Sequence, residues 1–83
     1  MRILNEDKGK DEAIYSVLLM LTRDEAKELR GSLDQLLSAE VGISHHHIND
    51  KDYQHEITIG LYDPLGKINQ FHQRVQKLIL EDK

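Results

Sequence analysis

The sequence predicts an α+β fold, a two-layer ββαββα sandwich in which a four-stranded, mainly antiparallel sheet carries two helices on one face. Two observations support this class. Each half of the chain holds strand-like runs separated by turn residues, and each half then continues into a segment with helical apolar spacing. The turns are short enough for antiparallel neighbours. No Gly/Pro/Ser-rich linker interrupts residues 1–83, so a single domain is expected.

The first two strands are expected on either side of the turn sequence "DKGK" at residues 7–10. Residues 1–6 form the shorter candidate. Residues 12–21, "EAIYSVLLML", are rich in aliphatic, aromatic and β-branched side chains and predict a long second strand. Both faces of this strand are largely apolar, which is typical of a strand that is covered on both sides.

The first helix is expected over residues 23–39. Thr22 and Glu25 have the spacing of a capping box, in which each side chain accepts a hydrogen bond from the backbone N–H of the other. Gly42 is the expected C-terminal stop. Apolar residues follow at steps of three and four. They are Ala26, Leu29, Leu33, Leu36 and Leu37.

The second pair of strands is expected at residues 43–48 and 53–62, joined by a turn centred on Asp50 and Lys51. Alternation of apolar with polar residues is clearest from Glu56 onward, which predicts a half-buried strand.

The second helix is expected over residues 65–80. Asp63 and Pro64 supply an N-cap and a proline at the first helical position. His72 lies on the apolar stripe of this helix, where it is expected to be a boundary or core residue with a satisfied ring nitrogen rather than a ligand.

The two halves have a weak internal similarity. "LNEDKGKDEA" at residues 4–13 aligns without gaps to "INDKDYQHEI" at residues 48–57. One reading is a duplication with pseudo-repeats at 1–41 and 43–83. The other is that two hairpin–helix units share a pattern by chance, and the sequence leaves both open.

Four of the five histidines lie in a histidine-rich hairpin, residues 44–56. With the expected turn, His46 lies opposite His55 on the helix-covered face, where the pair could titrate as a coupled, pH-sensitive unit. His45 lies opposite Glu56 on the other face, together with His47, because side chains alternate along a strand.

His45, His47 and Glu56 are therefore the candidate metal ligands. Two imidazoles and one carboxylate suit a divalent ion such as zinc or nickel with one open position. The alternative is that all these histidines are amphipathic surface residues. No other cofactor is expected.

An apolar patch is expected on the face of the sheet that the helices leave open. Its residues are Ile14, Leu18 and Met20, with Ile43 and Tyr62 as possible neighbours. Exposed apolar patches of this kind mark interfaces, which predicts a homo-oligomer, with a dimer favoured, or a complex with a protein partner. The alternative is that the N-terminal segment shields these side chains.

Composition excludes several classes of function. The net charge of −4 and the lack of a basic patch argue against nucleic acid as a partner. No stretch approaches about 20 apolar residues, so no membrane span is expected. The absence of cysteine favours a cytoplasmic location. No catalytic motif is present, and Ser44 and His45 point to opposite faces of a strand, so an enzyme is not favoured.

The sequence therefore predicts a small cytoplasmic protein-interaction module that self-associates and could regulate or inhibit a protein partner. Acidic turns would complement a basic surface on such a partner. The alternative function is a domain that binds a divalent metal or another small ligand through the histidine-rich hairpin.

Overall fold

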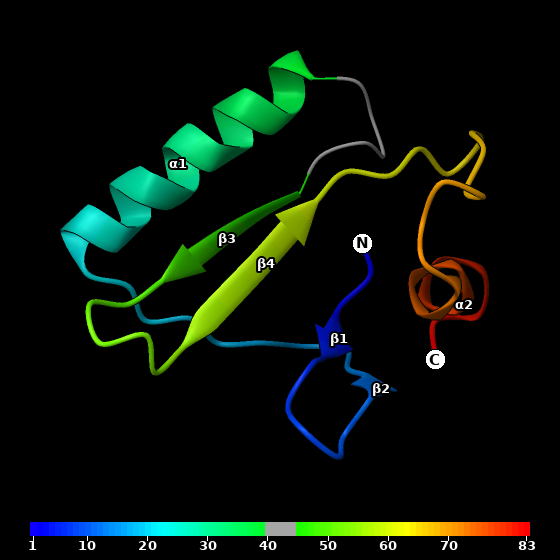
Figure 1. Ribbon diagram of the computed structural model, residues 1–83, viewed down its shortest axis with the longest axis horizontal. Helices are drawn as coiled ribbons and strands as arrows, with labels where there is room; N and C mark the ends of the chain where they lie inside the picture. The colour runs from blue at the N-terminus through cyan, green and yellow to red at the C-terminus, as the bar shows by residue number, and fades with distance from the viewer. Residues whose placement is uncertain (40–44) are drawn as a thin grey trace. The chain divides into compact units, whose positions relative to one another are not determined.

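The computed structural model describes residues 1–39 and 45–83 and shows an α+β chain (Figure 1). The elements follow in the order β1 (Leu4–Asn5), β2 (Glu12–Ala13), α1 (Arg23–Ser38), β3 (His45–Asn49), β4 (Glu56–Gly60) and α2 (Gln73–Glu81). β1 pairs with β2, and β3 pairs with β4, both antiparallel. In place of the expected four-stranded sheet, the described residues form two two-stranded sheets.

The contacts divide the chain into two compact units. The central unit is Met20–Gly66 and contains α1, β3 and β4. The terminal unit consists of Met1–Leu19 and Lys67–Lys83 and contains β1, β2 and α2. These limits differ from the halves proposed for the duplication, which remains a prediction.

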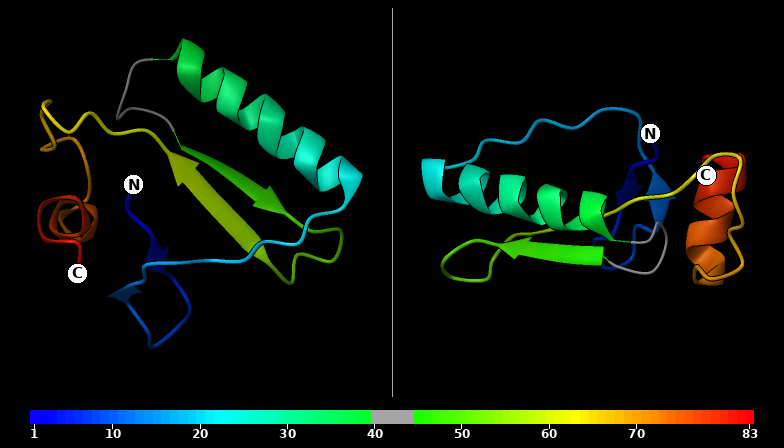
Figure 2. Two further views of the ribbon diagram at one scale, coloured as in Figure 1. Left: turned by 180° about the vertical axis from the view of Figure 1, so that it is seen from behind. Right: turned by 90° about the horizontal axis from the view of Figure 1, so that it is seen from above.

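In the central unit, α1 lies along one face of the β3–β4 hairpin (Figures 1 and 2). The expected capping box is present at the start of this helix. Thr22 Oγ1 accepts a hydrogen bond from the Glu25 N–H at 3.2 Å, and Glu25 Oε1 accepts one from the Thr22 N–H at 2.9 Å. The helix ends one residue before the expected limit, with Ala39 as its C-cap, so the prediction of α1 is confirmed. The expected stop, Gly42, lies outside the described residues.

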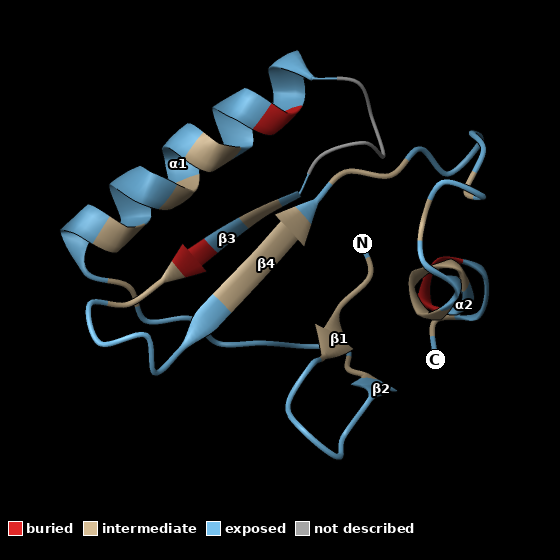
Figure 3. Cartoon of the chain, viewed as in Figure 1, coloured by how far each residue is buried: buried red, intermediate tan, exposed pale blue. Residues whose placement is uncertain are grey.

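The core of the central unit lies between this helix and the hairpin (Figure 3). Leu36 of α1 is 2% exposed and Ile48 of β3 is 3% exposed. Ile57 and Ile59 of β4 lie on the same face as Ile48 and are half-buried. The apolar side of the hairpin therefore faces the helix, because a strand that alternates in polarity buries its apolar face.

In the terminal unit, the β1–β2 hairpin is much shorter than expected. Leu4 pairs with Ala13, and one further hydrogen bond joins the Ile14 N–H to the Ile3 carbonyl at 2.9 Å. The strand expected over residues 12–21 is thus wrong beyond Ala13. Strand propensity alone does not make a strand, since each N–H and C=O needs a ladder partner, and β1 contributes only two residues.

The segment that was expected to begin the second helix forms a turn instead. Asp63 Oδ1 accepts a hydrogen bond from the Leu65 N–H at 3.0 Å, and the Asp63 carbonyl accepts one from the Gly66 N–H at 3.0 Å. An aspartate side chain can bind nearby backbone in this way and so competes with helix formation. Gly66 adds to the effect because glycine disfavours a helix interior.

The helix α2 begins at Gln73, eight residues later than expected, with His72 as its N-cap. The His72 Nδ1 accepts a hydrogen bond from the Arg74 N–H at 3.1 Å. His72 therefore starts the helix rather than lying on its apolar stripe, although its ring nitrogen is satisfied as expected. Leu78 and Ile79 are the buried residues of the helix.

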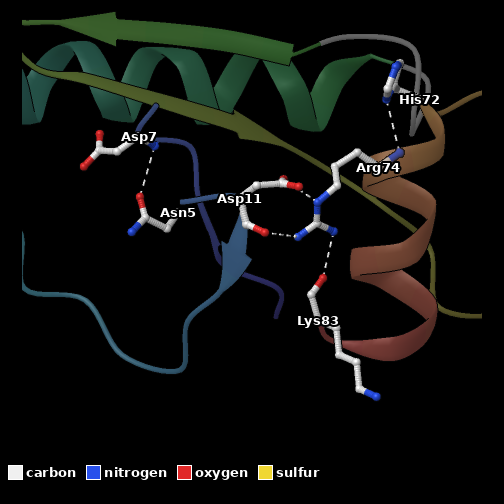
Figure 4. A network of polar contacts seen from close by, with 6 residues as sticks. All are labelled: Asn5, Asp7, Asp11, His72, Arg74 and Lys83. Atoms are coloured by element: carbon white, nitrogen blue, oxygen red, sulfur yellow. Dashed lines mark hydrogen bonds and ion pairs between the residues drawn. The ribbon is translucent and has the colours of Figure 1, made fainter. Parts of the chain in front are cut away.

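Arg74 links α2 to the β1–β2 turn within the terminal unit (Figure 4). Its Nε donates to Asp11 Oδ1 at 2.5 Å and its Nη2 to the Asp11 carbonyl at 3.2 Å. Its Nη1 donates to the Lys83 carbonyl at 2.7 Å. A second arginine also contacts α2: the Arg2 Nε donates to the carbonyl oxygens of Leu78 and Ile79, each at 3.1 Å. Arginine fits position 74 because its planar fork presents several donors at once.

Candidate functional site

The register of the β3–β4 hairpin differs from the expected one by four residues. His45 lies opposite Gly60 instead of Glu56, and His46 lies opposite Ile59 instead of His55. The predicted cross-strand pair of His46 and His55 is therefore wrong. Ile43, the start of the expected strand, lies outside the described residues.

The cause of this difference is a longer connecting loop, which is organised by Asp50. The Asp50 Oδ1 accepts hydrogen bonds from the backbone N–H groups of Gln54 at 2.7 Å and His55 at 3.2 Å. The Asp50 carbonyl accepts the Tyr53 N–H at 3.0 Å, and Tyr53 takes a positive φ of 55°. Aspartate commonly caps loops in this manner, so its position at the end of β3 was the signal that sequence reasoning missed.

The shift of four residues leaves the side chains of β3 and β4 on their expected faces, because side chains alternate with a period of two. His55 lies in the loop, where its side chain is 86% exposed, and not on the expected helix-covered face. His45, His47 and Glu56 lie on one face of the hairpin, and all three are exposed. Thr58, directly opposite His47, joins them on this face. Alternation with Glu56 along the strand could have identified Thr58 from sequence. We call these four residues the histidine–carboxylate face.

On the histidine–carboxylate face, the His47 ring is fixed by two neighbours on β4. Its Nδ1 lies 2.5 Å from Glu56 Oε1 and 3.0 Å from Thr58 Oγ1. The Thr58 hydroxyl also donates to Glu56 Oε1 at 3.2 Å. A carboxylate only accepts, so the network assigns a proton to Nδ1. In the neutral ring, Nε2 is then the nitrogen with the free lone pair.

His45 lies beside His47 on the same strand. The two ring centroids are 5.0 Å apart, and the planes meet at 89° in an edge-to-face arrangement. Residues two apart on a strand share a face, which explains their proximity.

The predicted ligand set of His45, His47 and Glu56 for zinc or nickel remains a prediction. Within residues 1–39 and 45–83, no group of three or more His, Cys, Asp or Glu side chains is arranged to hold a metal ion. Glu56 Oε1 is directed at His47 Nδ1, which gives this carboxylate a partner other than a metal.

The predicted interface residues occupy different environments. Leu18 and Met20 are 83% and 84% exposed, as an interface in a free monomer requires. Ile14 and Tyr62 are half-buried. Their role in an interface remains a prediction, and Ile43 lies outside the part of the chain that the structure describes.

At the base of the loop, the His55 ring supports Asp50 directly. His55 Nδ1 lies 2.6 Å from Asp50 Oδ2. This hydrogen bond, assisted by the backbone N–H groups of Gln54 and His55, holds the pKa of Asp50 below its ordinary value of 3.8, against the opposing effect of desolvation. A carboxyl group with a lowered pKa stabilises the fold above its ordinary pKa, and this stabilisation is lost as the pH falls through the lowered value.

We therefore expect the loop to open at acid pH. A ¹³C NMR titration of the Asp50 carboxyl carbon should give a midpoint below 3.8, and His55→Ala should raise this midpoint toward the ordinary value. In Asp50→Ala, exchange of the Gln54 and His55 amide protons should speed up by roughly fivefold, the factor expected for one lost hydrogen bond. A wild-type midpoint at or above the ordinary value contradicts the prediction.

Comparison with protein-family models, curated proteins and solved structures finds no match for this chain. In the described part of the chain, neither helix has the length and apolar character needed to cross a bilayer.

Proposed function

We propose that the protein is a self-associating interaction module in which a second copy of the chain pairs with residues 15–20, the exposed segment. The supporting observation is the run of accessible apolar side chains in this segment. Tyr15, Leu18 and Met20 are each more than 80% exposed, while Val17 is 56% and Leu19 is 46% exposed. A contiguous apolar run of this kind on a small chain is typical of an interaction surface.

The backbone of the exposed segment supports the same proposal. The segment continues directly from β2, whose pairing with β1 extends only to the hydrogen bond between Ile14 and Ile3. Its composition, "YSVLLM", favours a strand, yet it has no regular secondary structure. An extended chain with strand-forming side chains can gain ladder hydrogen bonds by pairing with another strand.

A second copy is the occupant that the charges favour. The exposed segment carries no ionisable group except the tyrosine hydroxyl, so two copies can align antiparallel without opposing like charges, although each chain carries −4 overall. Antiparallel self-pairing gives a closed two-fold dimer. It would also extend the β1–β2 hairpin, which is only marginally stable as an isolated two-stranded sheet.

The test is a concentration series of the untagged protein by size-exclusion chromatography with light scattering. We expect a dimer at micromolar concentration. Leu18→Lys should shift dissociation to concentrations at least about tenfold higher, because a buried charge in the new sheet costs more than about 1.4 kcal/mol. The thermal unfolding of the monomer should change little, since Leu18 is exposed.

Leu37→Lys is the matched control, because Leu37 is also highly exposed but belongs to α1. It should leave the dimer intact. A wild-type monomer at high micromolar concentration contradicts self-association, and equal effects of the two lysine variants contradict the exposed segment as the interface. A regulator or inhibitor that acts on a different protein would then be the better hypothesis.

A further inference from the structure

We infer that His45 and His47 form a binding site for a divalent first-row transition metal ion, in which Glu56 orients His47 and does not ligate the metal. The inference rests on the pairing of Glu56 with one nitrogen of His47, which leaves the other nitrogen for a ligand, and on the position of the second imidazole.

His47 presents one free ring nitrogen to a ligand. Its Nδ1 is held by Glu56 and Thr58, both on β4, and the proton assigned to this nitrogen leaves the Nε2 lone pair free. Metal-binding histidines commonly donate their second ring N–H to a carboxylate, which fixes the tautomer and increases the basicity of the ligating nitrogen. Glu56 stands in this relation to His47, and Thr58 adds a further hydrogen bond to the carboxylate.

The two imidazole rings lie close enough together to share one ion. A zinc–nitrogen bond of about 2.0–2.1 Å and tetrahedral geometry place the centroids of two imidazoles on one ion about 5 Å apart. The centroids of His45 and His47 are 5.0 Å apart. In the edge-to-face arrangement the edge of one ring is directed at the face of the other, so the His45 ring must rotate before a nitrogen of each ring points at one ion. His45 is exposed, so this rotation meets little resistance.

The two imidazoles determine which class of metal ion can bind. Imidazole nitrogen suits zinc, nickel and copper, whereas calcium and magnesium prefer oxygen ligands. His46, although adjacent in sequence, lies on the opposite face of β3 and cannot join the pair. Two protein ligands leave the remaining positions to water or to another group. This arrangement differs from the sequence-based set, in which Glu56 was a ligand.

The binding test uses Zn²⁺ alone, titrated into the untagged protein by calorimetry and checked by native mass spectrometry. One ion should bind per chain, and His45→Ala or His47→Ala should abolish this binding. His55→Ala is the matched control, because His55 is an exposed histidine of the same hairpin that contacts Asp50. This variant should retain the wild-type affinity. Absence of binding, or binding that survives either of the first two substitutions, overturns the inference.

A second measurement separates orientation from ligation by Glu56. Glu56→Gln should weaken Zn²⁺ binding by about 10- to 100-fold, as expected for loss of a supporting carboxylate. In long-range ¹H–¹⁵N NMR spectra of the wild type, Zn²⁺ should shift His47 Nε2 strongly, while Nδ1 keeps its proton. In the metal-free Glu56→Gln variant, the share of the Nδ1–H tautomer should fall. Coordination through His47 Nδ1, or an unchanged affinity of the glutamine variant, contradicts the role given to Glu56.

Discussion

Replacing Leu36 with alanine should lower the free energy of unfolding by about 2–5 kcal/mol, the range for large-to-small substitutions in a core. The side chain is only 2% exposed and belongs to the layer between α1 and the β3–β4 hairpin. Among the described residues of the central unit, Leu36 and Ile48 are the buried hydrophobic side chains. A domain of this size has about 5–15 kcal/mol of stability in total, so the loss is a large fraction.

The measurement is urea-induced unfolding followed by circular dichroism at 222 nm. Leu37→Ala is the matched control, since it removes the same atoms from the next position of the same helix, where the side chain is 72% exposed. This control should change stability by no more than about 0.5 kcal/mol. Similar losses for the two variants would show that α1 does not pack through Leu36.

The same pair of leucines shows how far helical periodicity reaches. The sequence pattern placed both Leu36 and Leu37 on the apolar stripe, and it predicted α1 and its capping box correctly. These features depend on residues three or four positions apart. Which leucine is buried depends on the position of the hairpin under the helix, and that information lies in contacts between distant parts of the chain.

The strands were less predictable because their pairing is not local. Residues 12–21 have strong strand propensity, but the ladder to β1 ends within three residues of the start of β2. In the second hairpin, the alternation of side chains identified the faces correctly for the residues of β3 and β4. The register was wrong because the Asp50 side chain organises a longer loop than the assumed turn.

The residues of the histidine–carboxylate face could be predicted from sequence, but the contacts between them could not. In the assumed register, Glu56 lay opposite His45 and read as a third ligand. In the observed register, Glu56 lies opposite Asn49 and contacts His47. Which histidine Glu56 contacts therefore depends on the length of the loop, which few local signals specify.

Replacing Arg74 with alanine should lower the free energy of unfolding by about 1.5–3 kcal/mol, the range for hydrogen bonds that involve a charged group. The guanidinium donates to both the side chain and the carbonyl of Asp11 and to the carbonyl of Lys83. The Arg74 side chain is 20% exposed but that of Asp11 is 71% exposed, so solvent competes for the carboxylate and we expect a loss near the lower end of this range.

Arg74→Lys separates charge from geometry in this network. Lysine keeps the positive charge but lacks the planar fork that reaches Asp11 and Lys83 together, so most of the stability loss should remain. Lys77→Ala, which removes an exposed cation from the same helix, should change stability by no more than about 0.5 kcal/mol. Full stability in the lysine variant would mean that charge alone holds α2 to the β1–β2 turn.

A double-mutant cycle that combines Arg74→Ala with Asp11→Ala measures the interaction energy between these two side chains directly. We expect a coupling of at least about 0.5 kcal/mol because the two residues are in contact.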